Sequence, residues 1–121
     1  LQTYSPSAVM HFAAFTSVGE SVADPARYYR NNVAGSLTLL EAVRDHGVGR
    51  FVFSSTAAVY GTPERVPIPE DLAKAPINPY GQTKLVIEHL LADFAAAGEL
   101  FPGGFRPGAG SVGLQAGALC R

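Results

Sequence analysis

The sequence predicts an α/β fold built on a parallel sheet. Two short runs, residues 8–14 and residues 50–53, are almost continuously apolar and lack the alternation of a strand with one face in solvent. Such runs are typical of strands buried on both faces, as in parallel sheets. A stretch with helical periodicity joins them, and the order strand, helix, strand is that of a right-handed crossover unit.

The connecting helix is predicted to begin at Asp24-Pro25 and to end near Gly47. An aspartate side chain can accept hydrogen bonds from the free N–H groups of a first helical turn, and proline is tolerated at the first helical position. Glycine is common just past a helix end. Apolar residues recur at helical spacing and predict one face that packs on the sheet. They are Val33, Leu37, Leu40 and Val43.

A proline-rich loop is predicted after the second strand, and a second helix follows it. The loop has too many prolines to be helical, and long loops of this kind often carry function. Its prolines are Pro63, Pro67, Pro69 and Pro76. The helix is expected to begin after Asn78-Pro79 and to continue to about Ala97, where Gly98 would cap it.

Residues 99–121 are predicted to form an irregular, glycine-rich tail, because they show neither helical nor strand periodicity. The tail contains Gly108-Ala109-Gly110-Ser111-Val112-Gly113, which matches the G-x-G-x-x-G string of dinucleotide-binding loops. That motif functions between a strand and a helix, whereas here no strand is predicted before it and only eight residues follow it. We therefore interpret the match as a product of composition, and the tail as out-of-frame or junction sequence.

Composition favours a small-molecule partner for a single modest domain of 121 residues. Nine Lys and Arg against ten Asp and Glu give a net charge of -1, which offers no electrostatic argument for nucleic acid or an anionic membrane. No apolar stretch approaches the roughly 20 residues that span a bilayer. The single Cys120 has no disulfide partner and no metal-ligand spacing around it, so we expect a cytoplasmic protein without a metal site. Leu1 in place of an initiating Met suggests a fragment.

The strongest functional signal is Tyr80-Gly81-Gln82-Thr83-Lys84, at the start of the second predicted helix. Residues four apart on a helix project from one face, so the Tyr80 phenol can lie beside the Lys84 ammonium. A neighbouring positive charge favours phenolate, which brings a tyrosine toward the working range of a general acid/base. The same spacing also occurs on helices as an amphipathic ring beside a solvated charge, so the pair needs supporting features.

A polar cluster, Ser54-Ser55-Thr56, closes the second predicted strand and supplies that support. Open parallel sheets bind ligands beyond the carboxyl ends of their strands, so the cluster and Tyr80 point to one crevice. There the Thr56 hydroxyl would share the hydrogen of a substrate hydroxyl with Tyr80. Proton transfer at a carbinol carbon is the predicted chemistry.

Six sequence blocks resemble, in order and spacing, those of the UDP-glucose 4-epimerases within the extended short-chain dehydrogenase/reductase superfamily. They are His11-Phe12-Ala13-Ala14, Val18-Gly19-Glu20-Ser21-Val22, Asp24-Pro25, Tyr28-Tyr29-Arg30-Asn31-Asn32-Val33, Phe53-Ser54-Ser55-Thr56-Ala57-Ala58-Val59-Tyr60-Gly61 and Asn78-Pro79-Tyr80-Gly81-Gln82-Thr83-Lys84. The resemblance covers about residues 6–97. It implies that residues 1–98 are the central part of an NAD-binding, Rossmann-like domain. This would be a doubly wound parallel sheet with flanking helices, without the first βαβ portion and the C-terminal substrate domain.

The resemblance implies three catalytic residues and a reaction. Tyr80 would take the proton from the 4-hydroxyl of a UDP-sugar, and Thr56 would bridge the substrate and the tyrosine. Lys84 would favour the phenolate and hydrogen-bond the nicotinamide ribose. Hydride would pass from C4 to NAD and return to the other face of a 4-keto sugar, so that UDP-glucose and UDP-galactose interconvert without net oxidation.

Contacts to NAD are also implied by the resemblance. Along the chain they are Phe12, Ala13, Ala14, Asn31, Ser54, Tyr80 and Lys84. Without the resemblance, Phe12 would be interpreted as a core residue and Asn31 as an amide on a helix surface. Thr16 stands where some epimerases have lysine, which others in the family lack.

Other interpretations stay open. The chain could come from another nucleotide-sugar epimerase or dehydratase, although the dehydratases carry an Asp-Glu pair directly after the threonine, where Ala57-Ala58 stand here. It could also be a non-catalytic remnant that offers a dimerisation surface, because the epimerases often form homodimers through two helices, here those beginning near Pro25 and Tyr80. We expect the truncated chain to be inactive alone. An incomplete parallel sheet would also leave strand edges and apolar faces exposed, which predicts aggregation or partial disorder.

Overall fold

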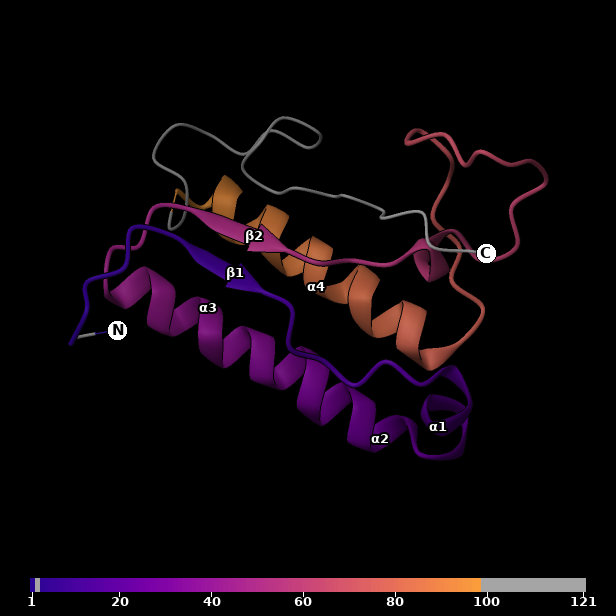
Figure 1. Ribbon diagram of the computed structural model, residues 1–121, viewed down its shortest axis with the longest axis horizontal. Coiled ribbons are helices and arrows are strands. Elements are labelled where there is room, and N and C mark those ends of the chain that lie inside the picture. Colours follow the sequence, from indigo (N-terminus) through magenta and orange to yellow (C-terminus); the bar gives the residue numbers. More distant parts are fainter. Residues whose placement is uncertain (2, 99–121) are drawn as a thin grey trace.

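The computed structural model describes residue 1 and residues 3–98, and these form an α/β unit (Figure 1). Strands β1 (Val9–His11) and β2 (Phe51–Phe53) pair in parallel, with Met10 opposite Val52. The predicted parallel sheet is therefore confirmed. The first strand is shorter than predicted, because it ends at His11 and residues 12–14 continue as irregular chain. The predictions for residues 99–121 lie outside the described residues.

Helix α1 (Val18–Ala23) precedes the predicted connecting helix and was not itself predicted. Its N-cap is Ser17, whose hydroxyl accepts a hydrogen bond from the Glu20 N–H at 3.3 Å. The helix has only six residues, so its sequence is too short to show a helical repeat.

The predicted connecting helix consists of three consecutive segments. Helix α2 (Pro25–Tyr28) begins at the expected place, where the Asp24 side chain accepts an N–H of the first turn. The π-helical turn η1 (Tyr29–Ala34) follows it and continues into α3 (Gly35–Asp45). The chain leaves this helix through Gly47, whose φ of 65° is a left-handed conformation that favours glycine.

The second half of the described chain carries a short 3-10 helix and an α-helix of 18 residues. The 3-10 helix η2 (Ala57–Tyr60) is joined by the loop of residues 61–78 to α4 (Pro79–Ala96). Asn78 caps α4, because its side-chain oxygen accepts the Gly81 N–H at 2.8 Å. The predicted start of this helix is therefore confirmed. No helix among the described residues is long and apolar enough to cross a membrane.

The hydrophobic core lies between one face of the sheet and helices α3 and α4. Its buried members are Leu40, Val43, Val48, Phe51, Phe53, Ile87 and Leu91. Leu37, which we expected on the buried stripe of α3, is instead 36% exposed. The buried positions of this helix are Ser36, Leu40 and Val43, so the stripe passes through Ser36 and leaves Leu37 at its edge.

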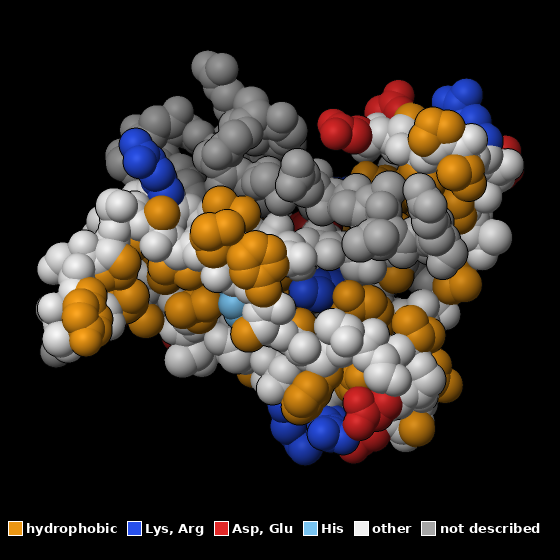
Figure 2. Space-filling view, in the orientation of Figure 1, with side chains coloured by type: hydrophobic (Ala, Val, Ile, Leu, Met, Phe, Trp, Pro, Cys, Tyr) orange, Lys and Arg blue, Asp and Glu red, His pale blue; other side chains and the backbone are white. Residues whose placement is uncertain are grey.

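The opposite face of the sheet is exposed in the part of the chain that the structure describes. In strand β1 the side chains alternate between the two faces, and Met10 points away from the core and is 65% exposed. Phe12, just after the strand, is 61% exposed. Figure 2 shows apolar side chains gathered over the strands on this side of the molecule. Exposed apolar groups of this kind favour association.

We expect the 121-residue chain to self-associate through this face. The variant Met10→Lys should raise the fraction of monomer, because a charge on the exposed face opposes its burial against a second copy. The control Met10→Leu, which keeps the apolar surface, should not. Light scattering over a range of protein concentrations would measure the effect. An unmodified chain that stays monomeric and melts in one sharp cooperative transition would contradict this expectation.

Candidate active site

Lys84 is buried at the carboxyl end of β2. Only 3% of the residue is exposed, although other positions of its helix, α4, face solvent. Its ammonium donates a hydrogen bond to the Ser54 carbonyl oxygen at 2.8 Å and lies 4.8 Å from the centre of the Phe53 ring. Burial lowers the pKa of Lys84 from its ordinary value. The structure therefore brings together Lys84 and Ser54.

Tyr80 lies one helical turn before Lys84, in the first turn of α4. Helical spacing places the two side chains on the same face. The Tyr80 N–H donates to the Ser21 hydroxyl oxygen at 3.1 Å, and the Tyr80 carbonyl accepts from the Thr83 hydroxyl at 2.7 Å. Helix α1, which carries Ser21, thus anchors the start of α4. The half-buried Tyr80 side chain remains accessible to a ligand.

Thr56 is the N-cap of η2, directly after the strand end. Its side-chain oxygen accepts the Ala58 N–H at 3.2 Å, so the hydroxyl proton is not used in this bond. The residue is half-buried. Ser55, immediately before it, donates its hydroxyl proton to the Glu88 carboxylate. The polar cluster is therefore held by α4, and the Thr56 hydroxyl keeps a donor for another partner.

Residues 12–14 continue from the carboxyl end of β1 as a short, largely exposed segment. It is fixed before and after: the Ser54 N–H donates to the His11 carbonyl at 3.1 Å, and the Phe15 N–H donates to the Asn32 side chain at 2.9 Å. Phe12 and Ala13 are exposed and Ala14 is half-buried. The interpretation of Phe12 as a core residue is therefore wrong, because the strand ends before it and most of the residue is exposed.

Asn31 shares an acceptor with the end of the segment of residues 12–14, because the side-chain oxygen of Asn32 also accepts the Phe15 N–H. Asn31 is exposed on η1, and its amide donates to the Asn32 side chain at 2.9 Å. Asn32, which we did not single out, is buried and forms the more extensive network. Its amide group donates to the Phe15 carbonyl at 3.0 Å and to the Thr83 hydroxyl at 3.2 Å. A tandem pair of asparagines in a helix was the only sequence signal for it.

His11 is a second residue that sequence reasoning missed. Its Nε2 lies 3.0 Å from the Ser36 hydroxyl oxygen. The centre of its ring lies 5.9 Å from the ring centres of both Phe51 and Phe53. Burial, and then the positive charge of Lys84, lower the pKa of His11 from its ordinary 6.5. A neutral imidazole therefore stands near the buried ammonium at neutral pH.

Gly81, in the motif between Tyr80 and Lys84, permits close contact between α4 and η2. A Cβ atom at this position would lie 2.6 Å from the Ala58 carbonyl oxygen and 3.1 Å from Pro76 Cβ. Because the first of these is a backbone atom, α4 could not accept a side chain here without moving from η2. The glycine thus sets the separation between the helix that carries Tyr80 and the segment that carries Thr56.

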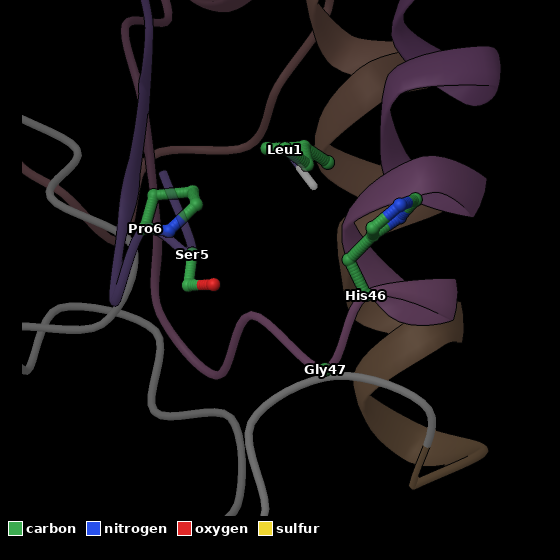
Figure 3. A pocket seen from close by; sticks show the side chains of 5 residues that line it. All are labelled: Leu1, Ser5, Pro6, His46 and Gly47. Carbon is green, nitrogen blue, oxygen red and sulfur yellow. The ribbon is translucent and has the colours of Figure 1, made fainter. Parts of the chain in front are cut away.

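A separate cavity of about 270 Å³ lies at the other end of the strands (Figure 3). Leu1, Ser5, Pro6, His46 and Gly47 line it, beside the start of β1 and the end of α3. It contains none of the predicted site residues. Among residues 1 and 3–98, no group of three or more His, Cys, Asp and Glu side chains could hold a metal ion.

The fold and this geometry define a class of protein. It is an α/β protein that presents a tyrosine, a lysine and a threonine beyond the carboxyl end of a parallel strand, where open sheets bind nucleotides and related ligands. The family model described as GDP-mannose 4,6 dehydratase matches residues 1–102, and the chain belongs to this family.

Within the family, the chain is similar to UDP-glucose 4-epimerases. It is 52% identical over 100 residues to the enzyme of Rhizobium leguminosarum bv. trifolii, which is 83% of this chain and 31% of that protein. It is 57% identical over 89 residues to the enzyme of Streptomyces lividans, covering 74% of this chain and 27% of that protein. The chain thus spans about 30% of the length of these relatives.

Solved structures give the same result. The UDP-glucose 4-epimerase of Brucella ovis in complex with NAD has a TM-score of 0.79 and 56% identity, covering 82% of this chain and 30% of that one. The Thermus thermophilus enzyme in complex with NAD has a TM-score of 0.77 and 39% identity, covering 82% and 32%. These findings confirm the predicted resemblance and the Rossmann-like fold class.

We expect the stability of the protein to fall in mild acid because of His11. Its pKa is lower in the folded protein than in the unfolded chain, so the unfolded chain binds the proton first as pH falls through 6.5. Stability is therefore lost between pH 6.5 and the folded-state pKa. The variant His11→Gln should show a shallower loss between about pH 7 and pH 5, measured by urea unfolding. The control His89→Gln removes an exposed imidazole, and an equal effect of both variants would refute the assignment.

Two glycine variants should change stability in opposite directions. Gly81→Ala should destabilise the protein by about 1–3 kcal/mol, because the new methyl group would overlap the Ala58 carbonyl. Gly35→Ala should stabilise it by up to about 1 kcal/mol, since nothing lies within 4 Å and alanine favours a helix. Urea unfolding followed by circular dichroism measures both. A Gly81→Ala protein as stable as Gly35→Ala would contradict the close contact.

Proposed function

We propose that this chain carries the catalytic helix of an NAD-dependent nucleotide-sugar 4-epimerase that interconverts UDP-glucose and UDP-galactose. The observation that carries the proposal is the buried Lys84, bonded to the strand end one helical turn after Tyr80. Because the ammonium is buried where the local dielectric is low, its electrostatic interaction with neighbouring groups is stronger than it would be in solvent. The similar enzymes of Rhizobium leguminosarum bv. trifolii and Brucella ovis support the assignment.

The described residues fit the nicotinamide end of NAD. Ala13 and Ala14 have small side chains and lie in the exposed segment between His11 and Phe15, so a flat ring and its ribose could approach the backbone there. Ser54 and Lys84 lie at the neighbouring strand end. Among the described residues there is no glycine-rich turn from a strand to a helix for the pyrophosphate. Structures of similar epimerases in complex with NAD, from Brucella ovis and Thermus thermophilus, support this cofactor.

In the proposed reaction, bound NAD supplies reversible hydride transfer at C4 of the sugar. Tyr80 takes the proton of the 4-hydroxyl and later returns it, and its accessible side chain suits that role. Lys84 stabilises the negative charge on the phenolate oxygen. Thr56, whose oxygen accepts the Ala58 N–H so that its hydroxyl proton is not used in that bond, orients the substrate hydroxyl toward Tyr80. Asn31 is exposed and bonded to Asn32, so its role as a direct NAD contact has the least support.

UDP-sugar is the proposed substrate class. A structural neighbour from Stenotrophomonas maltophila has bound NAD and formylated UDP-arabinopyranose, and one from Bifidobacterium longum is in complex with NAD+ and UDP. We also propose a role in galactose metabolism in the cytoplasm, and a homodimer formed through the helices that begin at Pro25 and Pro79. The exposed Tyr29 of η1 and His89 of α4 offer surface for that contact.

Sugar dehydration has less support than epimerisation. Removal of a C5 proton and a C6 hydroxyl would need an acid and a base after Thr56. Ala57 and Ala58 occupy these positions, in the first turn of η2, and neither side chain can transfer a proton. The described segment therefore favours the reaction that needs Tyr80 alone as acid/base.

Turnover of UDP-galactose by the product of the complete reading frame that carries this sequence tests the proposal. Tyr80→Phe should lower kcat by about 10²–10⁴-fold, because it removes the hydroxyl that transfers the proton. Tyr4→Phe is the matched control, since Tyr4 is exposed and far along the chain from the motif, and it should leave kcat unchanged.

NAD titration separates the enzyme from a non-catalytic remnant. Binding of NAD, followed by quenching of protein fluorescence, should persist in Tyr80→Phe while turnover is lost. The proposal is wrong if Tyr80→Phe retains full turnover. It is also wrong if the unmodified protein neither binds NAD nor converts UDP-galactose.

A further inference from the structure

Glu88 is a buried carboxylate that the proposed reaction does not use. It lies on α4 one helical turn after Lys84, and only 7% of its side chain is exposed. A buried carboxylate is costly unless it is paired and hydrogen-bonded. Each of its two oxygens has a separate partner. Oε1 accepts a hydrogen bond from the Ser55 hydroxyl, and Oε2 accepts one from the Lys74 ammonium. The two partners come from different parts of the chain.

The first partner belongs to the segment that presents Thr56. Ser55 stands between Ser54, whose carbonyl accepts the Lys84 ammonium, and Thr56. Helix α4 thus holds this segment at two consecutive residues, through side chains one helical turn apart. Together with the bond from the Ser54 N–H to the His11 carbonyl, these two bonds fix the position and the orientation of the peptide.

The second partner belongs to the loop of residues 61–78. Lys74 lies near the end of this loop, and its bond to Glu88 joins the loop to α4. The loop also returns to its own start: a Cβ on Gly61 would lie 2.2 Å from the Ala75 carbonyl oxygen. Its two ends are therefore in close contact beside the residue that binds Glu88. Most of the remaining loop is exposed, including Glu64 and Glu70.

We propose that Glu88 is a positioning residue for the reaction proposed above, on which this inference rests. Through Ser55 it fixes the peptide that carries Thr56, and through Lys74 it holds the loop of residues 61–78 against α4. Tyr80 and Glu88 lie on the same helix, α4, so this helix sets the position of Thr56 relative to Tyr80. The substrate hydroxyl then binds between two groups whose separation is fixed. Glu88 itself does not touch the reacting atoms.

The Ser55 contact is tested by kinetics with UDP-galactose, in the product of the complete reading frame. Ser55→Ala should lower kcat by about 10- to 100-fold and change KM less than about twofold, because a small displacement of Thr56 affects the chemical step more than ground-state binding. Ser55→Thr keeps the hydroxyl and should restore most of kcat. A full kcat in Ser55→Ala, or an equal loss in Ser55→Thr, would overturn the positioning role.

The Lys74 contact is tested without activity, by limited proteolysis. Endoproteinase Glu-C cuts the peptide bonds after Glu64 and Glu70. Mass spectrometry measures how fast each of these two peptide bonds is cleaved. Glu88→Gln removes the charge but keeps an acceptor for Ser55, and Lys74→Met removes the other partner at a partly exposed position. Both variants should be cut several-fold faster in the loop. Glu41→Gln on the exposed side of α3 makes the same charge change and should not accelerate cleavage.

The two measurements keep the two proposals apart. If the unmodified protein neither binds NAD nor converts UDP-galactose, the proposed function fails and the positioning role fails with it, while proteolysis still decides whether Glu88 holds the loop. If the protein is active but neither Glu88→Gln nor Lys74→Met is cut faster, the function stands and the loop contact is wrong.

Discussion

Burial of the Lys84 ammonium is the constraint on which the arrangement of the site depends. Removing such a charge from water costs several kcal/mol unless protein groups replace the solvent. Here the replacement is the Ser54 carbonyl, with the Phe53 ring nearby. Both belong to β2 or its end, so α4 must lie against the carboxyl end of that strand. The small Gly81 and the cap formed by Asn78 are what allow α4 to begin so close to η2.

The same requirement explains the polar residues on the rest of α4. This helix is buried on more than one side, with Thr83, Lys84 and Glu88 among its buried residues beside Ile87 and Leu91. A helix in that position must satisfy every polar group it buries. Thr83 bonds to Asn32 and to its own helix, and Glu88 bonds to Ser55 and Lys74. No buried side-chain nitrogen or oxygen among the described residues lacks a partner.

Local rules were sufficient where a residue acts on its own neighbours in sequence. Asp24, Asn78 and Gly47 mark helix ends through contacts within one turn, and their predictions are confirmed. Longer-range contacts were not predictable in this way. Asn32 is essential to the network only because Phe15 and Thr83, 17 and 51 residues away, come to it in the fold. Ser36 bonds to His11 and is buried while its neighbour Leu37 is exposed, which no periodicity of apolar residues could indicate.

Burial distinguishes supporting residues from those that can meet a ligand. Lys84 and Glu88 are almost fully enclosed and have protein partners, so their charges act on fixed groups around them. Tyr80 and Thr56 are only half-buried, and they lie on elements that those two residues hold in place. Catalysis benefits from reactive groups that are accessible but immobile, because orientation then costs little at the moment of reaction. The row Tyr80, Lys84 and Glu88, with one residue per turn of α4, provides both properties from a single helix.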